Sequence, residues 1–284
     1  MTAKCPAFSA INLKSMPPTS RKTPSPISKP ADDEVDARYR APALDKGLDI
    51  LELLCSQPAG LTRGEIDKAL GRRPSEGYRM LERLVARRYV TRSLEGDRYA
   101  PSLKLFLMAQ RHPPVNRLIA QSSPWMEAFA KRAEQSCHLG LYEDGNILIV
   151  AETTSPGKLS LSVRPGSLVS LVDTGSGHVL LAFQTPENRA QLLAAHQPLE
   201  GETAISQQEL EARLNRVRAD GYWQGDSQHA KGISDIAVPL LGPDGQAFAA
   251  LTCPYITRID HHVSASADLA RALLLDAAQG LSMS

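Results

Sequence analysis

Nine residues from Arg63 to Arg98, seven of them arginines, are candidates for contacting nucleic acid. An arginine guanidinium can donate two parallel hydrogen bonds to a guanine edge or to a phosphate, and a serine at the start of a helix can bind a phosphate. Taken alone, an arginine-rich helix is more often only a solvated face, but here a hairpin with further arginines follows it, which favours a DNA-binding surface. The candidate DNA-binding residues are Arg63, Arg72, Arg73, Ser75, Glu76, Arg79, Arg83, Arg92 and Arg98.

Residue pairs that could support catalysis or bind a metal are few and poorly arranged. Cys137 and His138 are adjacent in a predicted strand, so their side chains should point to opposite faces, a poor geometry for a nucleophile and its base. His261 and His262 have no acidic or cysteine partner at helical spacing, so we expect loop residues rather than metal ligands. The sequence has no Cys-x-x-Cys, Walker, Rossmann or Gly-x-Ser-x-Gly pattern. We expect no metal and no cofactor, and a small-molecule enzyme built on the second half of the chain is the main alternative.

The residues around the arginines predict a winged helix-turn-helix domain over residues 43–112. Thr62 and Glu65 have the spacing of a capping box at the start of a helix. Gly71 breaks that helix, and Pro74 suits the first turn of the next one. The expected elements are a helix from residue 43 to a breaker at 57–60, helices over 63–70 and from 74, a hairpin of strands 89–93 and 98–100, and a closing helix over 103–111.

The second half of the chain mixes extended and helical patterns, which predicts an α+β domain with helices packed on an antiparallel sheet. Asp144-Gly145 and Asp244-Gly245 are turn signals between apolar runs and predict two hairpins. We expect a linker helix within residues 113–135 and the sheet domain over residues 136–284. The expected strands are 138–142, 147–152, 158–163, 235–241 and 246–252, and the expected helices are 116–135, 176–183, 186–195, 206–219 and 266–279.

The charge of the chain is nearly balanced but unevenly divided, with 32 Lys+Arg against 31 Asp+Glu overall. Residues 43–112 hold 13 basic and 9 acidic residues, a net charge of +4, whereas residues 113–284 hold 12 and 18, a net charge of −6. A basic head on an acidic body fits a DNA-binding protein, although composition alone does not separate this from chance.

The N-terminal segment and the apolar runs indicate where the protein acts. Residues 1–42 are rich in proline and poor in large apolar side chains, so we predict a disordered tail. No apolar run is long enough to cross a bilayer, and no secretory signal is visible. The four scattered cysteines suit a reducing compartment. We therefore expect a cytoplasmic, nucleoid-associated protein with no membrane partner.

The order and spacing of these features resemble the IclR family of bacterial transcriptional regulators over roughly residues 43–280. In the first half, ALDKGLDIL and LTRGEIDKALGRRPS follow the family's helix-turn-helix pattern. In the second half, HLGLYEDGNILIVAE, GSLVSLVDTGSGHVLLAF and GYWQGDSQHAKGISDIAVP occur in the family's order. The resemblance implies a GAF-like effector domain of antiparallel-sheet architecture behind the winged helix-turn-helix domain.

The resemblance also implies a partner and a ligand. A homodimer or homotetramer would bind double-stranded operator DNA, and a small organic effector, an acid or an aromatic compound, would shift the linker helix. We therefore expect a ligand-responsive repressor or activator of genes for small-molecule catabolism, and a constitutive DNA-binding oligomer without effector is an alternative. The effector-binding residues that the resemblance implies are Leu159, Leu161, Gly175, Ser176, Asp226, Asp235 and Thr252.

Some positions depart from the family's pattern. Arg72-Arg73 and Glu76-Gly77 replace residues that are small, apolar or a threonine in the family, so the operator sequence cannot be carried over. His178 stands where the family has lysine or arginine, and Asp235 where it favours cysteine or a small residue. A carboxylate facing the pocket would repel an acid and favour a hydroxyl, an amine or a cation.

Overall fold

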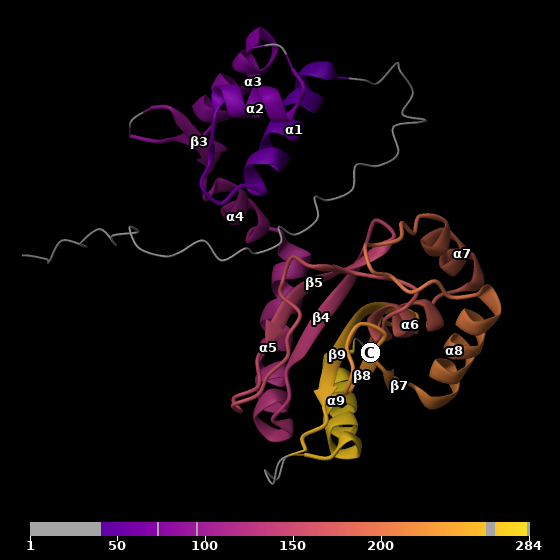
Figure 1. The fold of residues 1–284 in the computed structure, drawn as a ribbon. Helices are drawn as coiled ribbons and strands as arrows, with labels where there is room; N and C mark the ends of the chain where they lie inside the picture. The colour runs from indigo at the N-terminus through magenta and orange to yellow at the C-terminus, as the bar shows by residue number, and fades with distance from the viewer. Residues whose placement is uncertain (1–40, 73, 95, 260–264, 283–284) are drawn as a thin grey trace, which may run out of the picture. The chain divides into compact units, whose positions relative to one another are not determined.

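The computed structural model divides the chain into two compact units, with the boundary between Arg111 and His112 (Figure 1). It describes residues 41–72, 74–94, 96–259 and 265–282, without the side chains of residues 74–76. Four of the predictions lie outside the described residues: those for residues 1–40 of the tail, for Arg73, for the side chains of Ser75 and Glu76, and for His261-His262.

The first unit packs three helices and a small sheet around buried apolar side chains. Its three strands form one antiparallel sheet in the order β1-β3-β2. The order of its elements matches the predicted winged helix-turn-helix. The elements are α1 (Pro42–Cys55), β1 (Leu61–Thr62), α2 (Arg63–Ala69), α3 (Pro74–Ala86), β2 (Val90–Arg92), β3 (Arg98–Pro101) and α4 (Lys104–Ala109). The core is made of Ile50, Leu54, Ile66, Leu81, Val90 and Tyr99.

Local interactions fix both ends of α2. At its start the Thr62 hydroxyl accepts a hydrogen bond from the Glu65 amide at 3.3 Å, and the Glu65 carboxylate accepts one from the Thr62 amide at 2.7 Å. This confirms the predicted capping box, which satisfies two amides that the helix leaves unpaired. After α2 the chain turns at Gly71, whose φ of +60° suits glycine.

Gly77 explains how closely α3 packs on α2. A Cβ at this buried position would lie 2.9 Å from Oδ1 of Asp67. Glycine costs roughly 1 kcal/mol of helix propensity relative to alanine. Here it allows α3 to lie against the buried Asp67 side chain of α2.

The second unit is a six-stranded antiparallel sheet with helices on both faces. The strand order is β6-β5-β4-β9-β8-β7, so β4 and β9 lie at the centre. This confirms the predicted α+β fold. Its helices are α5 (Pro113–Ala133), α6 (Gly175–Ala182), α7 (Pro186–Ala194), α8 (Gln207–Asp220) and α9 (Ala267–Leu281), and its strands are β4 (Cys137–Glu143), β5 (Asn146–Thr153), β6 (Leu168–Val169), β7 (Trp223–Asp226), β8 (Ile233–Leu241) and β9 (Ala247–Ile256).

Alternating side chains of the strands belong to two separate hydrophobic cores, one on each face of the sheet. Along β8, Ile236 and Val238 pack with α5 and α9 on one face of the sheet. Ala237, between them, packs with α6 and α8 on the other face. This alternation is the period of two that an extended strand imposes. Figure 1 shows α5 and α6 on opposite sides of the central strands β4 and β9.

The predicted strand over residues 158–163 is wrong. The chain between β5 and β6 forms bends and coil there, and β5 pairs on this edge only with β6 among the described residues. The apolar alternation that suggested a strand has another cause, because Leu161 and Val163 line a cavity while Leu159 is half exposed.

The linker helix differs from the prediction in its start and its surroundings. α5 begins at Pro113 instead of Asn116, because a proline in the first turn lacks only an amide that would be unpaired anyway. Its second half is buried through Met126 and Phe129 in the core shared with α9. α5 is therefore part of the second unit rather than a free connection.

Gly177 offers a test of how tightly α6 is packed. A Cβ there would lie 2.0 Å from the carbonyl oxygen of Leu171, so Gly177→Ala should force α6 away from the preceding segment. We expect it to lower the free energy of unfolding by about 3 kcal/mol, as overpacking of a core does. Urea unfolding followed by tryptophan fluorescence measures this, because Trp125 and Trp223 both lie in the second unit.

Gly64→Ala is the control, because a Cβ at this exposed position of α2 meets no atom within 4 Å. It should leave stability unchanged or raise it slightly, as measured by circular dichroism. A Gly177→Ala variant that unfolds at the wild-type urea concentration would contradict the packing described here.

Candidate DNA-binding surface and ligand cavity

The outer face of α3 exposes the arginines that the sequence singled out. Arg79 and Arg83 are both exposed, four residues apart on one side of the helix. Arg87 and Arg88, which the sequence reasoning did not select, are exposed just after α3 and extend the basic surface. Their Arg-Arg pairing at a helix end was the signal that could have found them.

Arg72 has a different place from the one predicted. It precedes α3 rather than lying on its outer face, and its guanidinium forms an ion pair with Asp49 of α1. It also donates a hydrogen bond to the Lys46 carbonyl at 3.2 Å. Arg72 therefore ties the turn before α3 to α1.

The hairpin of β2 and β3 is the wing, and its arginines contact other parts of the first unit, the DNA-binding head, while keeping part of their side chains in solvent. Arg92 Nη2 donates to the Tyr99 hydroxyl at 2.6 Å, and Arg98 Nη1 donates to the Gly60 carbonyl at 3.1 Å. Their side chains are nevertheless 46% and 45% exposed, so each retains donors for an outside partner. Arg63 stacks over the Tyr78 ring of α3 at 4.6 Å.

The second unit contains a cavity of about 360 Å³ at the N-terminal end of α6. The apolar part of the lining comes from the segment between β5 and α6 and from Ile233 and Pro254, which lie beside Asp235 on β8 and β9. The polar part comes from α6, β4, β8, β9 and two loops. The apolar lining includes Leu161, Val163, Leu168, Val169, Ile233 and Pro254, and the polar lining includes His138, Ser170, Thr174, Ser176, Glu200, Glu202, Ser227, His229, Asp235 and Thr252.

The start of α6 forms the base of the cavity. Thr174 caps the helix by accepting a hydrogen bond from the Gly177 amide at 3.2 Å. The Ser176 and Thr252 hydroxyls lie 2.9 Å apart and join α6 to β9. Gly175 is required by close packing, because a Cβ there would lie 2.7 Å from the Trp223 ring.

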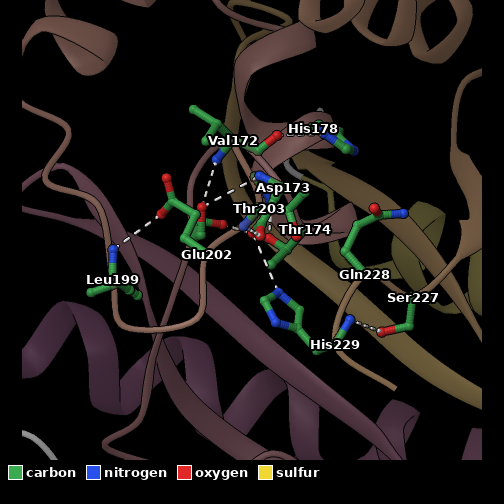
Figure 2. A network of polar contacts seen from close by, with 12 residues as sticks. Val172, Asp173, Thr174, His178, Leu199, Glu202, Thr203, Ser227, Gln228 and His229 are labelled. Atoms are coloured by element: carbon green, nitrogen blue, oxygen red, sulfur yellow. Dashed lines mark hydrogen bonds and ion pairs between the residues drawn. The ribbon is translucent and has the colours of Figure 1, made fainter. Parts of the chain in front are cut away.

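A buried carboxylate holds two loops beside the cavity (Figure 2). Asp173, whose side chain is 1% exposed, accepts a hydrogen bond from the Thr203 amide at 2.7 Å and lies 3.3 Å from Nε2 of His229. Thr203 belongs to the loop between α7 and α8, and His229 to the loop between β7 and β8. Asp173 therefore connects both loops to the N-terminus of α6.

The loop between α7 and α8 has a second attachment. His196 lies 2.8 Å from the Gly145 carbonyl through Nδ1 and 3.0 Å from the Glu202 carboxylate through Nε2. Glu202 also accepts a hydrogen bond from the Leu199 amide at 3.2 Å. Together these contacts fix the cavity-lining part of the loop against the turn between β4 and β5.

Burial changes the titration of three groups in and beside the cavity. It lowers the pKa of His138 to about 4, and that of His178 to about 4, so both rings are neutral at pH 7. The His178 Nε2 donates to the Val172 carbonyl at 2.8 Å and so fixes the segment before α6. Burial raises the pKa of Asp235 to about 6, against the opposing effects of His229 and a hydrogen bond from Ser227.

Five of the seven predicted effector-binding residues line this cavity, namely Leu161, Gly175, Ser176, Asp235 and Thr252. Leu159 and Asp226 do not line it. The sequence reasoning missed His138, His229 and Glu202, although strand alternation placed His138 on the face opposite Cys137. That opposition is confirmed, since Cys137 is buried in the core beneath α5 while His138 lines the cavity.

The part of the chain that the structure describes contains neither a metal site nor a membrane-spanning helix. No three His, Cys, Asp or Glu side chains there converge as a metal site. No described helix combines the length and apolar character that crossing a membrane requires.

Two family models match the chain, one for each unit. The model of the C-terminal domain of the bacterial transcriptional regulator IclR matches residues 115–283, and the IclR helix-turn-helix model matches residues 43–93. The chain belongs to the IclR family. It is therefore a transcriptional regulator whose first unit carries the family's DNA-binding helix-turn-helix.

Curated relatives and solved structures agree with this assignment. The HTH-type transcriptional regulator KdgR of Escherichia coli (strain K12) is 27% identical over 182 residues, which are 63% of this chain and 69% of KdgR. BhcR of Paracoccus denitrificans is 26% identical over 249 residues, 84% of this chain and 86% of BhcR. An IclR homologue from Microbacterium hydrocarbonoxydans, solved in complex with 4-hydroxybenzoate, shares the fold with a TM-score of 0.68 and 22% identity, covering 84% of this chain and 97% of that one.

The buried histidines predict how the stability of the second unit depends on pH. A histidine whose pKa is depressed from 6.5 to about 4 in the folded state stabilises the fold above pH 6.5, and that contribution is lost as the pH falls toward 4. For His138 the loss between pH 7 and pH 5 is roughly 2 kcal/mol. Asp235, with a raised pKa, has the opposite sign and gains stability over the same interval.

His138→Gln isolates the histidine contribution, because Asp235 and His178 remain in both proteins. Between pH 7 and pH 5, the wild type should lose roughly 2 kcal/mol more of its unfolding free energy than the variant does. Urea titrations monitored by tryptophan fluorescence at the two pH values give this difference. Equal pH dependence in the two proteins would show that His138 does not titrate as described.

Proposed function

We propose that this IclR-family regulator binds operator DNA through α3 and the wing, and that a small organic effector in the cavity changes that binding. The observation that carries the proposal is the exposed pair Arg79 and Arg83 on the helix that the helix-turn-helix presents to the major groove. Arginine at such a position reads guanine edges or holds a phosphate. The half-exposed Arg92 and Arg98 of the wing would contact the backbone.

The cavity is the proposed effector site. The volume of the cavity lies in the range of small-molecule pockets, and its lining combines apolar side chains with several polar groups. The relative solved with 4-hydroxybenzoate shows that a protein of this fold binds a small aromatic compound. By analogy with relatives such as the glycerol operon regulatory protein of Streptomyces coelicolor, we propose that the target genes serve small-molecule catabolism.

The proposed route from cavity to linker runs through β4. His138 lines the cavity, and its neighbour Cys137 packs on the opposite face against α5, with Sγ 3.8 Å from the Met126 carbonyl. A ligand that displaces β4 would therefore push directly on the helix that leads from the head. A coupling of about 1–3 kcal/mol is the usual size of such an effect.

We further propose that the heads form a homodimer and that the second units can join dimers into a tetramer. α4 buries none of its residues, and Phe106, Leu107 and Met108 are each about half exposed. On α1, Leu44 and Leu48 are similarly exposed. A dimer would cover such apolar surface and place two copies of α3 on a two-fold related operator.

The proposal includes no catalytic turnover, in keeping with relatives that are named as transcriptional regulators. A protein whose partner is the bacterial chromosome would act in the cytoplasm, associated with the nucleoid. Ligand-independent DNA affinity would favour a constitutive DNA-binding oligomer, and turnover of a small molecule would favour the enzyme.

Arg79→Ala tests the DNA surface. We expect its affinity for a duplex from upstream of its own gene to fall by about tenfold or more, because one base or phosphate contact is worth about 1–3 kcal/mol. Fluorescence anisotropy at two salt concentrations, with a scrambled duplex beside it, measures this. If Arg79 contacts a phosphate, the slope of log affinity against log salt concentration should also be shallower by about one in the variant.

Arg132→Ala is the matched control, since it removes the same charge from an exposed position near the end of α5 in the second unit. Its affinity should equal that of the wild type. If Arg79→Ala and Arg132→Ala bind the duplex alike, α3 is not the recognition helix.

Phe106→Lys tests the proposed head dimer. A lysine in the middle of the apolar surface of α4 should lower the oligomeric mass by a factor of two, because its charge would be buried in the interface. Light scattering coupled to gel filtration reports the mass. Leu94→Lys, at a fully exposed position in the wing, should keep the wild-type mass, and an unchanged mass for both variants would argue against this interface.

A further inference from the structure

The charge of the cavity lining is one-sided. Asp235, Glu200 and Glu202 line it, and none of the lining residues that the structure describes is a lysine or an arginine. His178, which follows the lining residue Ser176 on α6, is buried and uncharged at pH 7. An anionic effector would therefore meet carboxylates without a fixed positive charge to balance its own.

Compared with Glu202 and Asp173, Asp235 has more capacity left for a ligand. Glu202 is engaged by His196 and by the Leu199 amide. Asp173, just behind the lining, is engaged by Thr203 and His229. Among the described residues the side chain that donates to Asp235 is that of Ser227, whereas a carboxylate can accept about four hydrogen bonds.

A second, independent feature of the lining also points to a ligand. His138 is 4% exposed and lines the cavity, and its Nδ1 has no hydrogen-bond partner among the described residues. A neutral imidazole can accept a hydrogen bond from an N–H or O–H group. It offers no positive charge that would attract a carboxylate.

The N-terminus of α6 is the one feature that favours an anion. A helix N-terminus is equivalent to about half a positive charge, which is less than the full negative charge of Asp235 alone. The Ser176 hydroxyl at this terminus is already paired with Thr252. The polar part of the lining is therefore negative overall, and the rest of the lining, with Leu161, Val163 and Ile233, is apolar.

Building on the proposed function, we propose that the effector is a small organic amine, with its ammonium group against Asp235 and its apolar body against the apolar side chains of the lining. These side chains supply burial, and the carboxylate supplies the charge that selects an amine over an acid of the same shape. Asp235 is then the residue that determines the specificity of the site.

This arrangement fixes the direction of the pH dependence. The groups that act on Asp235 are His229 and Ser227 from the loop before β8, Asp173 before α6 and Cys253 of β9. The cavity lining adds His138, Glu200 and Glu202. With a pKa of about 6, Asp235 is ionised at pH 7.5 and mostly protonated at pH 5.5. Amine affinity should therefore fall about fourfold from pH 7.5 to pH 5.5, whereas an acid would bind better at the lower pH.

Three probes of matched shape test the proposal on the full chain: tyramine, 4-hydroxyphenylacetate and tyrosol, which carry an ammonium, a carboxylate and a hydroxyl group. Isothermal titration calorimetry at pH 7.5 and pH 5.5 gives the affinities. We expect tyramine to bind at least tenfold more tightly than either of the others at pH 7.5, and its affinity to fall at pH 5.5. Asp235→Asn should abolish this preference, while Asp226→Asn, a neighbouring carboxylate outside the lining, should keep it.

Several outcomes would overturn the inference: no binding of tyramine, equal binding of the three probes, tightest binding of the acid or the alcohol, or a preference that survives in Asp235→Asn. The wild-type pH dependence decides the matter even if a variant does not fold. Anisotropy on the operator duplex separates this from the proposed function. If only the acid changes operator binding, the proposal of an amine effector is wrong and the proposed regulator function stands. If the protein does not bind operator DNA at all, the proposed function itself is wrong.

Discussion

The arrangement of the cavity in the second unit depends on one buried carboxylate, that of Asp173. Removing a carboxylate from water is costly unless donors replace the lost solvent. Asp173 obtains its donors from two loops that are distant in sequence, through the Thr203 amide and the His229 ring. Satisfying this one group therefore requires both loops to come together beside the N-terminus of α6, and the cavity is the space that they enclose with the sheet.

The features that sequence reasoning recovered are those set by nearest neighbours. The capping box at Thr62 and the turn at Asp144-Gly145 depend on residues within a few positions of one another, so their chemistry is readable directly. The same holds for the opposition of Cys137 and His138, which follows from the geometry of any strand. The wrong prediction of a strand over 158–163 shows the limit of such local reasoning. Alternation indicates only that the two sides of a segment differ, and here Leu161 and Val163 face a cavity although the segment belongs to no sheet.

The part of the site that could not be predicted depends on contacts between residues far apart in the sequence. His229 meets Asp173 across 56 positions, and His196 meets the Gly145 carbonyl across 51 positions. The family resemblance supplied several lining residues because it encodes such pairings indirectly. It gave no indication of His138 or His229, whose roles arise from their surroundings in this particular chain.

The central strand β4 has a consequence for how this protein can diversify. Cys137 faces the core beneath α5, and His138 faces the cavity, so neighbouring positions on one strand serve two separate environments. On the proposed function, substitution at the cavity-facing positions of β4, β8 and β9 would alter what is recognised without disturbing the packing of α5 and α9. A sheet of this design would let ligand preference change between descendants while the face that packs against these helices is kept.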